Sequence, residues 1–200
     1  MNIERISKQL SFLTEIDKLK KIIRQTALTD GSRLENTAEH SWHIALAAVI
    51  MSEYSNSSEV NIDRVVRMLL IHDLVEIDAG DTFLYSDVDP AVKYEKEELA
   101  ANRIFKLLPE DQASYYLSLW YEFESASTDD ARFAKAIDAF QPLLLAYHNK
   151  GWSWKKHNIS KQTVLGKKES MKLGSNALWE LTLHLLDEAE TKGYFPDSSN

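Results

Sequence analysis

The chain has 200 residues, of which 44% are apolar and 27% charged, and this composition is ordinary for one soluble globular domain. It has no cysteine, which excludes disulfides, thiol nucleophiles and cysteine-bound zinc. Its net charge of −8 argues against general affinity for nucleic acid or for an anionic membrane. The longest apolar run, residues 44–51, is too short to span a bilayer, and the charged N-terminus lacks the apolar segment of a signal peptide. We therefore expect a cytoplasmic protein with no membrane or nucleic-acid partner.

Apolar residues recur at helical spacing along the chain, whereas strand-like alternation does not persist. Glycine and proline are scarce, at six and four residues. The spacing and the cap residues predict helices over residues 3–28, 37–54, 62–77, 91–108, 109–125, 129–149 and 170–192. Residues 81–90 and 151–168 are predicted to be irregular, and the second stretch is locally basic. We expect an all-α fold, a single compact multi-helix domain over residues 1–195, with a loose tail at 196–200.

The predicted helix over residues 62–77 carries two acids in an apolar setting. Residues 65–77 are apolar nearly all round, which is typical of a buried helix. A carboxylate there is costly unless it is paired or binds a metal, and this applies to both Asp73 and Glu76. His72 and Asp73 are about 100° apart around a helix and can reach one ion, while Glu76 lies one turn beyond His72. The alternative is a core histidine satisfied by a neighbouring acid.

Two other predicted helices contribute a histidine and an acid. His40 lies near the start of the second helix and shares a face with His43, although either histidine could simply be packed or solvated. Asp138 lies in the largely apolar sixth helix, where it could instead be a boundary carboxylate bonded to an arginine. Pro142 removes the amide that would bond to the Asp138 carbonyl, which predicts a kink beside this acid.

Taken in chain order, these residues resemble the H…HD…D pattern of the HD-domain phosphohydrolases. The matching positions are His40, His72, Asp73 and Asp138. Over nearly its whole length the chain resembles the bacterial branch of 5′-deoxynucleotidase-like HD hydrolases, and the matching stretches are residues 33–42, 71–82 and 131–138. A lone His-Asp pair is a weak signal, but three such blocks in order are specific.

The resemblance implies a metal site and two catalytic carboxylates. It assigns one divalent metal ion to His40, His72, Asp73 and Asp138, with water completing the coordination. Two imidazoles and two carboxylates suit Mn²⁺, Co²⁺, Fe²⁺, Ni²⁺ or Zn²⁺, and ligand type alone does not choose among these ions. By the same resemblance, Glu76 orients or deprotonates the attacking water, and Asp81 positions that water or protonates the leaving ribose oxygen.

The resemblance also implies hydrolysis of nucleoside 5′-monophosphates, including deoxynucleotides, to nucleoside and phosphate. Arginines suit the phosphate because a planar guanidinium can form two parallel hydrogen bonds with it. Arg24 and Arg33 are the candidates, and a surface ion pair is the alternative for each. The deoxynucleotidases read Arg-Thr-Gly-Trp where this chain reads Arg24-Gln25-Thr26-Ala27, so the substrate stays open.

Three functions remain in competition. The first is the nucleoside monophosphate hydrolase, and the second is a hydrolase of another phosphate ester or of a nucleotide di- or triphosphate. The third is an HD domain that senses a nucleotide without turnover, but the presence of Glu76 and Asp81 favours an enzyme because a sensor needs no acid and base.

The remaining aromatic and basic residues predict packing and partners. Trp42 is expected in the core, with stacking on a base as the alternative. The basic residues 150–157 form either a lid over an anionic substrate or a solvated loop. Family resemblance, together with the apolar and aromatic residues between 91 and 121, predicts a homodimer, unless these side chains only complete the core.

Overall fold

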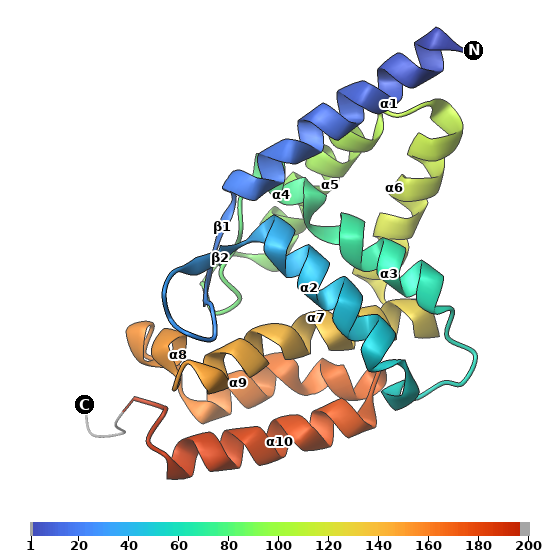
Figure 1. The fold of residues 1–200 in the computed structure, drawn as a ribbon. Coiled ribbons are helices and arrows are strands. Elements are labelled where there is room, and N and C mark those ends of the chain that lie inside the picture. Colours follow the sequence, from blue (N-terminus) through green and yellow to red (C-terminus); the bar gives the residue numbers. More distant parts are fainter. Residues whose placement is uncertain (1, 197–200) are drawn as a thin grey trace.

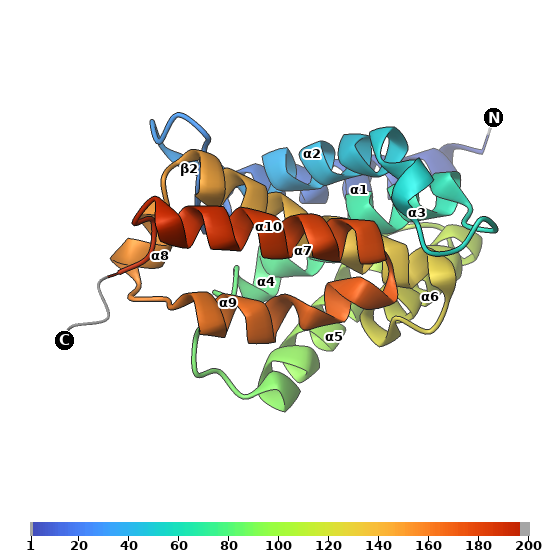
Figure 2. The same ribbon diagram turned by 90° about the horizontal axis from the view of Figure 1, so that it is seen from below.

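Helix α7 (Asp129–His148) runs through the middle of the molecule in the computed structural model, which describes residues 2–196 (Figure 1). Helices α2 (Thr37–Ile50) and α3 (Ile62–Ile71) pack on one side of it. Helix α10 (Asn176–Thr191) and the 3₁₀ turn η4 (Glu169–Leu173) pack on the other side (Figure 2). The long central helix therefore supplies the frame on which residues from distant parts of the sequence meet.

The remaining elements complete this arrangement. The helices are α1 (Ile3–Ile16), α4 (Glu76–Ala79), α5 (Pro90–Phe105), α6 (Glu110–Ser125), α8 (Trp152–Lys156) and α9 (Lys161–Lys168). Three 3₁₀ turns, η1 (Asp17–Lys21), η2 (Ser52–Tyr54) and η3 (His72–Val75), and two strands, β1 (Ile23–Ala27) and β2 (Leu34–Asn36), connect them. None of the helices within residues 2–196 is long and apolar enough to cross a membrane. The predicted all-α fold class is confirmed, with a small sheet added.

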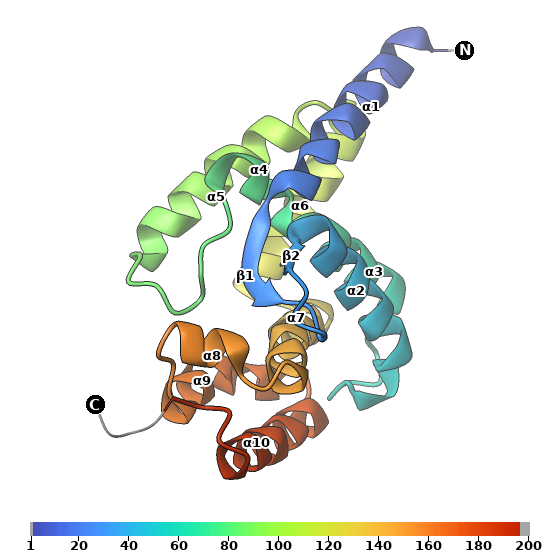
Figure 3. The same ribbon diagram turned by 60° about the vertical axis from the view of Figure 1, so that its left-hand side comes forward.

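The predicted first helix over residues 3–28 is wrong beyond Ile16. The chain turns through η1 and enters β1, which pairs antiparallel with β2 in the register Ile23 with Asn36 and Ala27 with Leu34 (Figure 3). Strand formation here depends on a partner that lies beyond the turn, and helical spacing of apolar residues cannot reveal such a partner. The correction matters for function because β1 lies against α7 and α8 and carries Arg24.

The predicted helix over residues 62–77 is interrupted where the site residues lie. Helix α3 ends at Ile71, His72 to Val75 form the 3₁₀ turn η3, and α4 ends before Gly80, whose φ of 76° suits glycine. A 3₁₀ turn has about three residues per turn, so it rotates neighbouring side chains further apart than an α-helix does. Helix α3 is also one-sided, since Leu70 is exposed, and so the expectation that it is buried all round is wrong.

The segment 151–168 is helical rather than irregular, because it forms α8 and α9. The predicted last helix is likewise divided, and the break lies at Gly174 between η4 and α10. A Cβ atom at Gly174 would lie 2.0 Å from the backbone oxygen of Arg132 on α7, so only glycine allows this close approach. These short elements bring the C-terminal part of the chain against α7.

One hydrophobic cluster runs through the whole fold, from Phe12 to Ala189, and supports a single domain. Trp120, Phe105 and Phe133 are among its largest fully buried side chains. Trp42 is not part of it, because 63% of this residue is exposed, so the expectation that it packs in the core is wrong. The loose tail predicted at 196–200 lies, apart from Pro196, outside the described residues.

Candidate metal centre

Four side chains from three separate elements meet beside the middle of α7. The Nε2 atom of His40 lies 3.0 Å from Oδ1 of Asp138 and 3.8 Å from Oδ2 of Asp73. The Nε2 atom of His72 lies 3.0 Å from Oδ1 of Asp73 and 3.7 Å from Oδ1 of Asp138. One ligand atom from each of His40, His72 and Asp73 lies within 4.8 Å of the other two, so the donors can converge on one cation.

Local structure explains why His40 reaches this point. Asn36 caps α2 by accepting a hydrogen bond from the Glu39 amide, and the Glu39 side chain accepts one from the Asn36 amide. This capping box starts the helix at Thr37, which places His40 in its first turn, where the side chain is fully buried. The capping box therefore has a direct consequence for the site, because it fixes where His40 lies on α2.

Both histidines are oriented through their other ring nitrogen. Nδ1 of His72 lies 2.9 Å from the Leu69 carbonyl oxygen, and Nδ1 of His40 lies 3.0 Å from Oε1 of Gln141. Gln141 cannot easily turn its amide, because its Nε2 faces acceptors on Glu35 and His43, each at 3.1 Å. If each Nδ1 donates its proton, each Nε2 presents a lone pair, which is the usual arrangement around a metal-binding histidine.

The buried charges of the cluster fit a cation. Nε2 of His72 is buried and has no hydrogen-bond partner among the described residues. Burial by itself lowers the pKa of the His72 imidazole, but the carboxylates of Asp73 and Asp138 outweigh this effect and raise that pKa to about 10. Two half-buried carboxylates around two buried imidazoles fit a divalent ion from the first transition row, for which imidazole and carboxylate are both suitable ligands.

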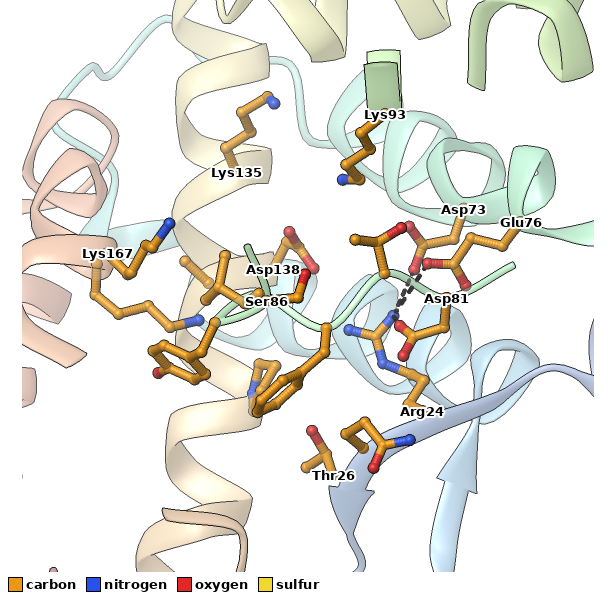
Figure 4. Close-up of a pocket in the computed structure, with 18 of the residues that line it drawn as sticks. Arg24, Thr26, Asp73, Glu76, Asp81, Ser86, Lys93, Lys135, Asp138 and Lys167 are labelled. Carbon is orange, nitrogen blue, oxygen red and sulfur yellow. Dashed lines mark hydrogen bonds and ion pairs between the residues drawn. The ribbon is translucent and has the colours of Figure 1, made fainter. Parts of the chain in front are cut away.

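Arg24 enters the cluster from β1 and is almost fully engaged by acids (Figure 4). Its guanidinium approaches Asp73 at 2.9 Å, Glu35 at 3.4 Å, Asp81 at 3.8 Å and Glu76 at 3.9 Å. The arginine therefore offsets part of the negative charge that these acids concentrate in a buried place.

Glu76 and Asp81 lie beside the cluster and line the same cavity as Asp73. Oε2 of Glu76 accepts a hydrogen bond of 2.8 Å from the hydroxyl of Thr37. Burial, together with the charge of Asp73, raises the pKa of Glu76 to about 9, and burial also raises the pKa of Asp81. No described contact joins Glu76 to either imidazole, since the Nδ1 atoms bond to Gln141 and to a backbone carbonyl.

The cavity beside the cluster has a volume of about 430 Å³, within the range of small-molecule sites. Its lining combines the acids with aromatic side chains and with several cations, which are Arg24, Lys93, Lys135, Lys167 and Lys168. Such a mixed wall suits an organic anion with an apolar or aromatic part.

Arg33, a candidate for substrate binding, and Trp42, for which stacking on a base is the alternative, lie outside the cavity. Arg33 does not line the cavity, and its guanidinium instead forms an exposed ion pair of 2.7 Å with Glu39. Trp42 is exposed on α2 and does not line the cavity either. Both residues are close in sequence to His40, but the Arg33 side chain pairs with Glu39 and the Trp42 side chain is exposed to solvent.

Sequence reasoning missed several polar residues around the centre. Gln141 lies three residues after Asp138, so helical spacing could have placed it on the same face of α7. Thr37 and Glu35 carried no comparable signal, because a threonine or glutamate at the start of a helix is expected to serve its cap. The structure shows instead that Thr37 contacts Glu76 and that Glu35 contacts Gln141.

Comparison with known proteins gives the family. The family model described as "HD domain" matches residues 16–179. The 5′-deoxynucleotidase HDDC2 of Homo sapiens is 31% identical over 138 residues, which are 68% of this chain and 66% of that protein. The 5′-deoxynucleotidase YBR242W of Saccharomyces cerevisiae is 28% identical over 147 residues, which are 69% of this chain and 58% of that one. The match thus spans just under two thirds of the human relative's length.

Solved structures agree with this comparison. A crystal structure of a predicted metal-dependent phosphohydrolase from Magnetospirillum magnetotacticum is 50% identical, with a TM-score of 0.92 and coverage of 96% of both chains. The HD domain-containing protein YGK1 is 18% identical with a TM-score of 0.61 over 92% of this chain and 86% of that one, which shows a shared fold alone. The resemblance drawn from His40, His72, Asp73 and Asp138 is confirmed at the level of the family, and this chain belongs to the HD-domain family.

Proposed function

We propose that this chain is a metal-dependent phosphomonoesterase that hydrolyses nucleoside 5′-monophosphates, deoxynucleotides among them, to nucleoside and phosphate. The observation that carries the proposal is the convergence of two histidines and two aspartates next to Glu76 and Asp81 at the wall of one cavity. The names of relatives such as human 5′-deoxynucleotidase HDDC2 support the choice of substrate class.

We propose that His40, His72, Asp73 and Asp138 hold one divalent ion, of which Mn²⁺, Co²⁺, Fe²⁺, Ni²⁺ and Zn²⁺ are the candidates. When bound, such an ion lowers the pKa of water and offsets the charge of a phosphoryl group. Gln141 and the Leu69 carbonyl keep the two imidazoles in the orientation that this role needs.

The acids at the cavity wall have separate roles in this proposal. Glu76 accepts a proton from the attacking water, which requires its carboxyl to be ionised although burial raises its pKa. A cation bound beside it would lower that pKa, and the hydroxyl of Thr37 holds the carboxyl in place. Asp81 protonates the leaving ribose oxygen, and burial, which raises the pKa of its carboxyl, favours this role over that of a base. Arg24 lies in the cavity wall and stays the proposed arginine near the phosphate, whereas the position of Arg33 gives it no such role.

A second substrate class keeps the same chemistry. Lys167 lines the cavity and pairs with no acid within the described residues, and its charge favours a substrate with more phosphate than a monophosphate carries. A nucleotide di- or triphosphate is therefore the alternative substrate. A sensor without turnover is less favoured, because Glu76 and Asp81 would then have no use beside the metal cluster.

We also propose a cytoplasmic homodimer, and the exposed apolar side chains of the structure support the dimer. Leu119 and Trp120, expected at an interface, are only 1% and 0% exposed and belong to the core. Exposed apolar side chains lie on α1, on α2 and on α5, and they include Ile3, Leu10, Leu13, Trp42, Val49, Ile50, Val92, Tyr94 and Leu99. Analytical ultracentrifugation at micromolar concentration tests the dimer, and a monomer there refutes it.

The proposed activity is tested by phosphate release. Metal-free protein is reconstituted separately with each candidate ion and assayed against the ribo- and deoxyribonucleoside mono-, di- and triphosphates. The proposal expects inorganic phosphate from monophosphates with at least one ion and none in the presence of excess chelator. Release from triphosphates alone would favour the alternative substrate class, and no release from any nucleotide would refute both.

A further inference from the structure

Lys168, the last residue of α9, is a buried cation in the wall of the active-site cavity. Only 6% of this residue is exposed. Within residues 2–196 its ammonium group forms no ion pair and no hydrogen bond, and the charges that act on it are those of Asp138 and Arg24. Burying a lysine side chain without a partner for its charge costs folding free energy. An anionic ligand bound beside the ammonium group would offset this cost.

Three of the other four cations of the cavity are already matched with acids, and the fourth, Lys167, is exposed. Arg24 is surrounded by carboxylates, and its shortest contact is 2.9 Å to Asp73. Lys93 pairs with Glu97 at 3.3 Å, and Lys135 pairs with Glu124 at 3.7 Å. Lys168 therefore differs from them in being both buried and free to bind an added anion, as far as the described residues show.

Lys168 lines the same cavity as Asp138, which is one of the proposed metal ligands. The charge of Asp138 is close enough to act on the pKa of the Lys168 ammonium, although burial dominates and lowers that pKa to about 8. The ammonium is thus still mostly protonated at neutral pH. Lys167, its neighbour in the chain, is exposed at the edge of the cavity, on the opposite side of Asp138 from Asp73, Glu76 and Asp81 (Figure 4).

A purely structural explanation for Lys168 is weak. Lysines are favourable in the last turn of a helix because they face the negative end of its dipole. Such a lysine normally stays solvated or bonds to nearby oxygen atoms, as Lys192 near the end of α10 does with the Glu188 carboxylate and the Tyr147 hydroxyl. Lys168 does neither, since it is buried and makes no such bond within the described part of the chain.

We propose that Lys168 binds the phosphoryl group of the substrate, by donating hydrogen bonds to non-bridging oxygens of a phosphomonoester dianion from the α9 side of the cavity. The proposal rests on the proposed function and deepens it, because it names the cation that positions the phosphate. A compact ammonium with three donors suits this task. Lys167 increases the attraction of the anion to the edge of the cavity.

Titration of inorganic phosphate into Mn²⁺-loaded protein tests the proposal without requiring turnover. Lys168→Met keeps the length of the side chain and removes its charge, while Lys168→Arg keeps the charge. Loss of a charge-assisted hydrogen bond should weaken phosphate binding about 10- to 100-fold in Lys168→Met, with partial recovery in Lys168→Arg. The matched control is Lys155→Met, an exposed lysine on α8 outside the cavity, and it should bind phosphate like the wild type.

Thermal unfolding separates a binding role from a structural one. Removing an unpaired buried charge should leave the melting temperature of ligand-free Lys168→Met unchanged or raise it. Unchanged phosphate affinity in Lys168→Met, whether or not its melting temperature falls, would overturn the proposal. If the wild type binds phosphate through Lys168 but releases none from any nucleotide, this inference stands and the proposed function fails. If Lys168→Met hydrolyses nucleotides with unchanged KM, the inference fails and the function stands.

Discussion

Replacing Glu76 by glutamine should abolish most of the turnover while leaving the metal in place. The substitution keeps the shape of the side chain, and the amide oxygen can still accept the hydrogen bond from Thr37, which is 2.8 Å long in the structure. It removes only the capacity to take up a proton. General acid–base assistance is typically worth about 10²- to 10⁴-fold in rate, so kcat should fall by about that factor.

The structure explains why metal binding should survive. Neither imidazole depends on Glu76, since Nδ1 of His40 lies 3.0 Å from Gln141 and Nδ1 of His72 lies 2.9 Å from the Leu69 carbonyl. Gln141→Met should instead weaken metal binding, because it removes the hydrogen-bond acceptor that orients His40. Loss of such a partner typically weakens metal affinity about 10- to 100-fold.

The assay measures metal content and rate on the same preparations. Each variant is loaded with one ion, dialysed against a graded series of chelator concentrations and analysed for bound metal, and initial rates of phosphate release are then recorded. Glu76→Gln should hold its metal like the wild type, whereas Gln141→Met should lose it at lower chelator concentration. The reasoning is refuted if Glu76→Gln loses its ion as readily as His72→Ala does, or if it keeps most of its turnover.

Four further substitutions test the site and the fold. Asp73→Ala should abolish both metal binding and activity, and phosphate release by a metal-free Asp73→Ala protein would contradict the metal centre. Trp120→Ala should cost about 3–5 kcal/mol of unfolding free energy because Trp120 is fully buried, which lowers the melting temperature by roughly 6–20 °C; a fall of under about 2 °C would contradict its place in the core. Gly174→Ala should destabilise by about 1–3 kcal/mol because its Cβ would meet the backbone of Arg132, whereas Gly166→Ala, in α9 with open space around it, should stabilise by about 0.4–1 kcal/mol. Equal melting temperatures for these two glycine variants would show that the close approach is not rigid.

The proposed metal centre could be anticipated from the sequence because two of its acids break a local rule and because its residues follow the pattern of the HD-domain family. Asp73 and Asp138 are acids in apolar helical segments, and such acids call for a compensating partner wherever the helices finally pack. The capping box that starts α2 is likewise local, so the position of His40 could be predicted. These inferences do not depend on knowing how the helices are arranged.

The features that were wrong or missed depend on contacts between distant segments. The strand β1 exists because β2 pairs with it, and so the arginine that reaches the acids is Arg24 on that strand while Arg33 in the connection points outward. The 3₁₀ turn at His72 interrupts a sequence whose apolar pattern continues through it. Gln141 and Lys168 carry no unusual pattern, since a glutamine in a helix and a lysine at its end are common, and only the packed structure shows what they face.

We propose above that His40, His72, Asp73 and Asp138 hold one divalent ion. This proposal is tested most directly by anomalous diffraction from crystals of metal-loaded protein, recorded on both sides of the absorption edge of the ion. The account predicts one strong anomalous peak per chain, within coordination distance of Nε2 of both histidines and of a carboxylate oxygen of each aspartate. A peak held instead by His43 or His148, or full activity in crystals and solutions free of metal, would contradict it.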